Sequence, residues 1–203
     1  MNSGVTAERV YDALKRRLLS GELLPGARLE PGRLAADLAS SVTPVRDALN
    51  RLAGERLVET RASEGFHLPH LAEPMLRDLY AWNAALLRLV ARSWPAGSRT
   101  PCADALPANP AQAVPALFAL FAARSDNREH AAQIASANDR IAAARTAEAG
   151  TLDGLEDELG AMAVAFDQDS LPHLLRLVGS YHRRRLAAVP RILRTLYEPR
   201  PRQ

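Results

Sequence analysis

Three amphipathic helical patterns occupy the first part of the chain. Apolar side chains recur three or four residues apart over residues 10–18, 34–38 and 45–52, which predicts three short helices with one inward face each. The pair Pro25-Gly26 predicts a turn after the first helix. In the third helix we expect Thr43 to be the N-cap and Pro44 the first helical residue.

The pattern changes after Gly54. The segments RLVET (56–60) and GFHLP (65–69) predict two short strands around a turn at residues 61–64. Three small helices followed by a hairpin predict a winged helix-turn-helix domain over residues 1–71.

From Ala72 onward the pattern is helical throughout. We expect a fold that is mainly α, with a C-terminal all-α helical bundle over residues 72–203. A Pro-rich loop follows the first helix of that bundle. The predicted helices lie at about 73–94, 111–125, 127–147, 151–167 and 170–196.

Composition changes this picture little. Of the 26 basic residues only Lys15 is not arginine. Arginine suits bidentate phosphate contacts, but genome composition produces the same bias. The single Cys102 excludes an internal disulfide framework, and no apolar run reaches the ~18 residues of a membrane span. We therefore expect a cytoplasmic protein without a membrane partner.

The helix-turn-helix segment resembles the DNA-binding domain of the GntR family of bacterial transcription regulators. The resemblance rests on the Pro25-Gly26 turn, the second helix LAADLA, the stretch TPVRDAL (43–49) and the wing glycine Gly65. It implies that the third helix enters the major groove of double-stranded DNA and that the wing lies along a minor groove or the backbone.

The resemblance assigns DNA contacts to six residues. Arg46 is expected at a base edge, with guanine as its partner, and Asn50, one turn later, either reaches a base or is solvated. The hydroxyl groups of Ser41 and Thr43 would join the helix N-terminus at a phosphate. Arg33 and His67 would contact the backbone and set position without reading sequence.

Two departures from the family pattern affect affinity. Val42 stands where the family often has arginine, and Glu64 places a negative charge at the wing tip. Residues 1–71 contain ten basic and nine acidic side chains, a net charge of +1. We therefore expect an altered site preference and modest affinity.

The C-terminal part resembles the helical effector domain called FCD, which accompanies one large GntR subfamily. The matching pieces are RDLYAWNAALLRLVAR, FALFAARSDN, NDRIAAAR and YHRRR. The FCD domain binds ligands and often holds a metal and a small carboxylate. Its metal-ligand positions fall on Val114, Phe118, the neighbourhood of Glu158 and His182, so we expect no metal and no cofactor.

A pocket for a small organic effector remains compatible with this pattern. The residues that would line it are equally compatible with plain packing, and both interpretations stay open. They are Asn83, Phe118, Arg145, Glu158, Tyr181 and His182.

The expected function is that of a sequence-specific transcriptional regulator. The resemblance implies a homodimer that binds a two-fold-related operator and acts as a ligand-responsive repressor. The alternative is a constitutive, architectural DNA-binding dimer whose helical domain is only a dimerisation scaffold. No nucleophile elbow or paired-carboxylate motif is visible, so we do not expect an enzyme.

Overall fold

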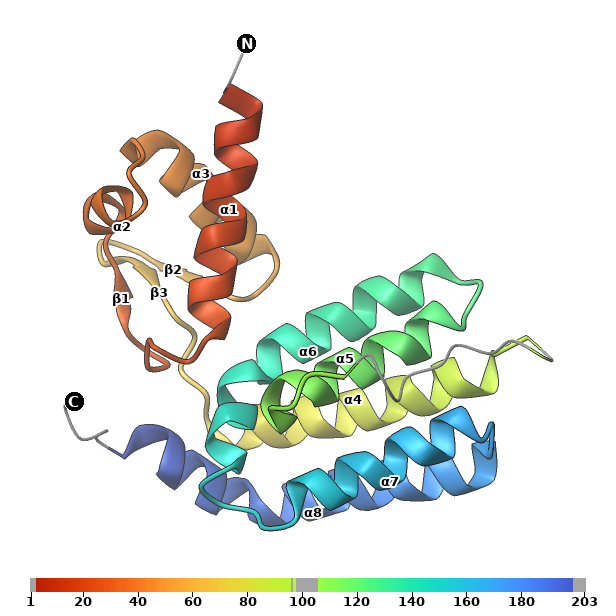
Figure 1. The fold of residues 1–203 in the computed structure, drawn as a ribbon. Coiled ribbons are helices and arrows are strands. Elements are labelled where there is room, and N and C mark those ends of the chain that lie inside the picture. The colour runs from red at the N-terminus through yellow and green to blue at the C-terminus, as the bar shows by residue number, and fades with distance from the viewer. Residues whose placement is uncertain (1–2, 96, 98–105, 199–203) are drawn as a thin grey trace. The chain divides into compact units, whose positions relative to one another are not determined.

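The computed structural model describes residues 3–95, 97 and 106–198, and the chain is mainly α, as the pattern predicted (Figure 1). It divides into two compact units, Met1–Leu71 and Ala72–Gln203. Cys102 lies outside the described residues. No described helix is both long enough and apolar enough to cross a bilayer.

The N-terminal unit is a three-helix domain with a small sheet. Tyr11 and leucines on all three helices form its core with residues of the hairpin. Its elements are α1 (Ser3–Leu19), β1 (Arg28–Leu29), α2 (Pro31–Asp37), α3 (Val42–Gly54), β2 (Glu59–Arg61) and β3 (Gly65–His67).

The predicted hairpin is present, and a third strand joins it. The sheet is antiparallel with the order β1-β3-β2, so β3 is the central strand and Phe66 pairs with both Leu29 and Thr60. The sequence pattern missed β1 because two residues are too few to show a period. Gly26, with φ +87°, makes the turn before β1, and its N–H donates to the Leu68 carbonyl at 3.0 Å.

The described residues of the C-terminal unit form a bundle of five helices, whose arrangement Figure 1 shows. The side chains of Asn109 and Asn127 cap α5 and α6 by accepting from backbone N–H groups at 2.9 and 3.0 Å. The helices are α4 (Glu73–Arg92), α5 (Pro110–Ala123), α6 (Arg128–Glu148), α7 (Leu155–Asp167) and α8 (Leu171–Tyr197).

Most predicted helix bounds agree with the structure to within about two residues, but α7 starts four residues later than expected. Gly154, with φ +62°, occupies its N-cap, and Thr151 and Leu152 instead donate backbone hydrogen bonds to the carbonyl of Glu148. The chain therefore finishes the turn after α6 before α7 begins.

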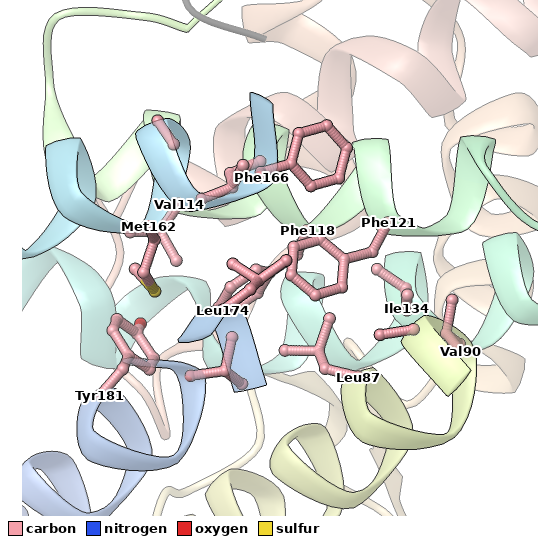
Figure 2. Packing of buried hydrophobic residues seen from close by; sticks show 14 of the residues in the cluster. Leu87, Val90, Val114, Phe118, Phe121, Ile134, Met162, Phe166, Leu174 and Tyr181 are labelled. Atoms are coloured by element: carbon pink, nitrogen blue, oxygen red, sulfur yellow. The ribbon is translucent and has the colours of Figure 1, made fainter. Parts of the chain in front are cut away.

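One hydrophobic core holds this bundle together. Side chains from all five helices meet there, including Leu87, Phe118, Ile134, Phe166 and Leu174 (Figure 2). Aromatic rings supply much of the contact, and Trp94 packs edge-on against Phe121 at 5.2 Å and Phe166 at 5.6 Å between ring centroids.

Candidate nucleic-acid interface and buried polar cluster

The helix α3 presents one apolar and one polar face. Its apolar face is buried in the unit, as the sequence pattern predicted, and consists of Val45, Ala48, Leu49 and Leu52. Its opposite face is exposed and includes Arg46 and Asn50, which lie one helical turn apart. Ser41 and Thr43 are also exposed, at the N-terminal end of the same helix.

The predicted cap of α3 is wrong by two residues. The helix begins at Val42, Ser41 is the N-cap with an extended backbone, and its side chain makes no capping hydrogen bond. Thr43 is therefore the second residue of the helix. Pro44 still lies in the first turn, where the missing N–H has no intrahelical partner to lose. The free N–H groups at this end remain available to a phosphate.

Arg46 has no ion-pair partner within the described residues, unlike Arg17 and Arg51. Arg17 donates to Asp37 at 2.7 Å, and Arg51 donates to Glu8 at 2.9 Å while lying 3.7 Å from the Tyr11 ring centroid. Arg33 on α2 is exposed and is likewise unpaired within the described residues. Arg46 and Arg33 are thus free to meet an external anion.

The wing contributes less positive charge than its arginine suggests. Arg61 lies 3.5 Å from a carboxylate oxygen of Glu59 and 3.9 Å from one of Glu64. Two acids beside one base leave the tip of the hairpin with a local negative balance, which opposes phosphate binding.

His67 does not fit its predicted role as a backbone contact. The side chain is only 7% exposed, and Nδ1 has no hydrogen-bond partner within the described residues. It lies on β3, the central strand, where its register partners are Arg28 and Glu59 on the two flanking strands. A ring covered in this way cannot reach DNA without a rearrangement of the hairpin.

The six residues predicted to line an effector pocket come together in the helical unit. They contact one another and their neighbours rather than surround an open space. Phe118 is fully buried, with ring centroids 5.5 Å from Tyr181 and 6.1 Å from His182. The guanidinium carbon of Arg145 lies 5.8 Å from the Phe118 ring centroid.

His182 is neutral, and both of its ring nitrogens lie within hydrogen-bond distance of a partner. Its Nδ1 lies 2.7 Å from the Val178 carbonyl, which can only accept, so Nδ1 carries the proton. Burial lowers the pKa of His182 to about 3. The other ring nitrogen, Nε2, therefore accepts, and the Asn83 amide 2.9 Å away must present its NH₂ group.

A buried ion network adjoins these residues. Arg185 donates to Glu148 at 2.9 Å and to Glu158 at 2.6 Å, while Tyr80 donates to the second oxygen of Glu148 at 2.7 Å. Burial and the nearby Glu148 carboxylate raise the pKa of Tyr80 well above its ordinary value, so the phenol keeps its proton. Glu158 is thus held by Arg185.

The space left beside this network is small. A pocket of about 20 Å³ lies between α5, α6, α7 and α8, with Arg145, Glu148 and Arg185 among its lining residues. That volume accommodates roughly one water molecule. Arg145 donates both Nη groups to Asn138, at 3.0 and 2.8 Å, and its Nε has no partner in the described residues. Nowhere in the described part of the chain do three or more His, Cys, Asp or Glu side chains form a group that could hold a metal.

Residues 6–68 match the sequence model of the family described as "Bacterial regulatory proteins, gntR family". The match covers nearly the whole N-terminal unit. The match includes the helix α3 with its exposed polar face and the whole wing.

The curated relatives support the same assignment for this unit. The regulator McbR of Escherichia coli is 37% identical over 71 residues, which are 35% of this chain and 32% of McbR. The Nta operon regulator of Aminobacter aminovorans is 45% identical over 62 residues, 30% of each chain. The repressor GlaR of Escherichia coli is 30% identical over 76 residues, 37% and 34% of the two chains. These matches thus span about a third of each relative.

Solved structures extend the likeness to both units. Escherichia coli McbR/YncC superposes with a TM-score of 0.70 over 92% of this chain and 97% of that one, at 20% identity. A GntR protein of Rhodococcus sp. RHA1 gives a TM-score of 0.72 over the same shares, at 17% identity. The mainly helical fold of these two structures is therefore shared over nearly the whole chain. The relatives are described as transcriptional regulators or a transcriptional repressor.

Sequence reasoning missed three central members of the buried polar cluster in the helical unit. Tyr80, Glu148 and Arg185 lie on three different helices. Tyr80 and Glu148 are 68 residues apart along the chain, and Arg185 and Glu148 are 37 residues apart. In the sequence, each of them is an ordinary residue of a helix. One signal was available: Glu148 and Arg185 each fall on the face of their helix that carries the buried side chains.

Proposed function

We propose that the chain is a sequence-specific regulator of transcription that binds double-stranded operator DNA through α3. The observation that carries this proposal is the exposed face of α3, which includes Arg46 and Asn50. The side chain of the N-cap residue makes no hydrogen bond to the backbone N–H groups at the start of this helix. The helix lies within the residues that match the gntR family model. An unpaired arginine one turn into such a helix suits a guanine edge in the major groove, and the free N–H groups suit a flanking phosphate.

In this proposal, Ser41, Thr43 and Arg33 fix the position of α3 on the backbone, and the wing adds little. A single unit of this size reads only a few base pairs, so the functional form is a homodimer on a two-fold-related site. Occupancy of the operator would repress transcription. The repressor name carried by GlaR, a relative of the DNA-binding unit, supports this direction of control.

The experiment is selection of bound fragments from a genomic DNA library, followed by titration of the selected site. A shared two-fold motif, bound much more tightly than either half-site alone, is the expected result. Recovery of fragments without any common motif would contradict sequence-specific binding.

We infer that the helical unit, an FCD-type domain by its resemblance, is chiefly a dimerisation scaffold. Phe118, Tyr181 and His182 pack against one another, and Glu158 is held by Arg185. The pocket of about 20 Å³ is far below the ~300 Å³ of ordinary ligand sites. An effector would first have to break the contacts of Phe118 with Tyr181 and His182.

A thermal-shift screen of small metabolites separates the scaffold from a ligand-responsive repressor. We expect no shift, because a ligand stabilises only the protein state that it binds. A metabolite that raises the melting temperature and also weakens operator binding would establish the responsive repressor.

Elemental analysis of untagged protein is expected to find well under one equivalent of zinc, nickel or manganese, because Val114 and Phe118 offer no donor atom.

A further inference from the structure

Val42 is an exposed aliphatic side chain at the start of the helix that we assign to DNA. It is 38% exposed and is the first residue of α3, directly after the N-cap Ser41. The other large apolar side chains of α3 are buried in the core of the N-terminal unit. Within the described residues, Val42 is not among the apolar side chains that form or flank that core. The fold therefore does not require an apolar residue at this position.

Val42 lies on the same side of α3 as the two side chains assigned to the bases. Positions 42, 46 and 50 are four residues apart, so Val42, Arg46 and Asn50 follow one another along one side of the helix. All three side chains are exposed. In helix-turn-helix proteins the N-terminal residues of the recognition helix contact the base edges. A helix that brings Arg46 to a guanine therefore also brings Val42 into the major groove.

The chemistry of valine limits what Val42 can meet in that groove. Its side chain has neither a hydrogen-bond donor nor an acceptor, so it cannot pair with a phosphate or with the polar atoms of a base edge. The apolar group that base pairs present in the major groove is the C5-methyl group of thymine. Contact between the valine and this methyl group removes apolar surface of both from water, which favours binding.

We propose that Val42 is a specificity-determining residue that reads the methyl group of a thymine. Val42 and Arg46 lie about 6 Å apart along the axis of α3, and successive base pairs lie about 3.4 Å apart, so this thymine lies within about two base pairs of the guanine that Arg46 reads. The inference rests on the proposed function, because it takes α3 to lie in the major groove.

Deoxyuridine tests the contact at the level of one methyl group, because uracil is thymine without its C5-methyl group. Each thymine of one selected half-site is replaced in turn by deoxyuridine, and binding of the full chain is titrated. We expect one thymine near the guanine whose replacement weakens binding about fourfold, the factor that corresponds to the burial of one methyl group. V42A should weaken binding to the unmodified site by at least the same factor.

The coupling between the protein change and the DNA change is the decisive measurement. With V42A, replacement of the same thymine should change affinity by less than about twofold, because the side chain that meets the methyl group is gone. L24A is the matched control, since Leu24 is 40% exposed but lies between α1 and β1. L24A should keep the full sensitivity to deoxyuridine. Circular dichroism should show that both variants keep their helical content.

Three results would each overturn this role of Val42. They are a selected half-site without a thymine near the guanine, a half-site in which no thymine methyl group affects binding, and a V42A chain that is as sensitive to deoxyuridine as the parent chain. R46A keeps these results separate from the proposed function. If R46A loses the preference for the operator while no methyl group matters, α3 reads DNA and only the role of Val42 fails. If the selection yields no common motif, the proposed function fails as well.

Discussion

Arg46 is the side chain on which sequence recognition depends in our proposal. It is exposed, unpaired within the described residues and one turn into α3. We expect R46A to cost about 1–3 kcal/mol of binding free energy on the selected operator and little on random DNA, because a base contact is lost only at the cognate site. Anisotropy titration of both DNAs measures this.

The matched control is R16A, which removes an exposed arginine from α1. It should affect both DNAs equally and weakly. Equal losses for R46A on the two DNAs would make Arg46 a phosphate contact, and no loss on either would exclude α3 from the groove.

His182 makes the stability of the helical unit depend on pH. Its pKa is about 3 in the folded chain, against 6.5 for an ordinary histidine. The unfolded chain binds a proton below about pH 6.5 that the folded chain refuses, so the stabilisation is fully present above pH 6.5 and is lost as the pH falls towards 3. The expected slope is about 1.4 kcal/mol per pH unit within that window.

Urea unfolding between pH 7 and pH 4 measures this slope. Acidic groups add their own pH dependence, so the informative quantity is the difference between the parent chain and H182Q. H182Q should lack the histidine contribution. Parallel curves for the two proteins would show that His182 is protonated in the folded state.

Single residues also show where sequence reasoning succeeds and where it stops. The buried face of α3 could be predicted because Val45 and Leu49 follow a period that the helix imposes. The cap could not be placed, because Ser41 and Thr43 are both good caps two residues apart. His67 was misplaced because it lies on the central strand of the sheet, and β1, which makes that strand central, leaves no pattern in the sequence.

At the level of elements, the wing limits DNA affinity. Glu64 lies at its tip, 63% exposed, with Arg61 within 3.9 Å. We expect E64Q to raise affinity for operator and random DNA alike, because it removes a repulsive charge and releases Arg61 to meet a phosphate. The slope of log affinity against log salt should steepen by up to about one unit.

Salt-dependent titration on both DNAs tests this, with E22Q as the control. Glu22 is also exposed but lies in the turn after α1 rather than in the wing. If E64Q changes nothing while E22Q behaves normally, the wing does not approach the backbone.

The ion network ties α4, α6, α7 and α8 together. Arg185 is 1% exposed and neutralises Glu148, which is 4% exposed. R185M should destabilise the helical unit by about 3–5 kcal/mol, because it leaves a buried carboxylate without its partner. Adding E148Q and E158Q should recover part of this loss.

Chemical denaturation of the full chain gives these values. R184M is the control, since Arg184 is more exposed and its ion pair with Glu158 is longer, at 3.7 Å. Its cost should stay within about 1 kcal/mol. Equal costs for the two variants would show that the buried network does not hold the helices together.

The elements themselves were largely predictable, but the contacts between them were not. Long periodic segments fixed every helix of the C-terminal unit, because apolar side chains recur with the helical period wherever a face is buried. The pairing of Arg185 with Glu148 depends on which helices become neighbours, and a period within one helix carries no information about that. The same limit applies to the closed cluster around Phe118, which the sequence left open as either a pocket or packing.

At the scale of the whole molecule, the spacing of the two half-sites tests the dimer on DNA. Each copy contributes one reading helix, and the two copies are joined through their helical units in our proposal. The half-sites must therefore face the same side of the duplex. Inserting about five base pairs between them rotates one half-site to the far side, whereas about ten base pairs make one full turn.

We expect the five-pair insertion to reduce affinity to that of a single half-site. The ten-pair insertion should recover part of the loss, because the face is restored while the distance is longer. Titration of the three sites with the parent chain makes the comparison. If the parent chain binds all three equally tightly, each copy reads DNA independently, and the helical units do not couple the two reading helices.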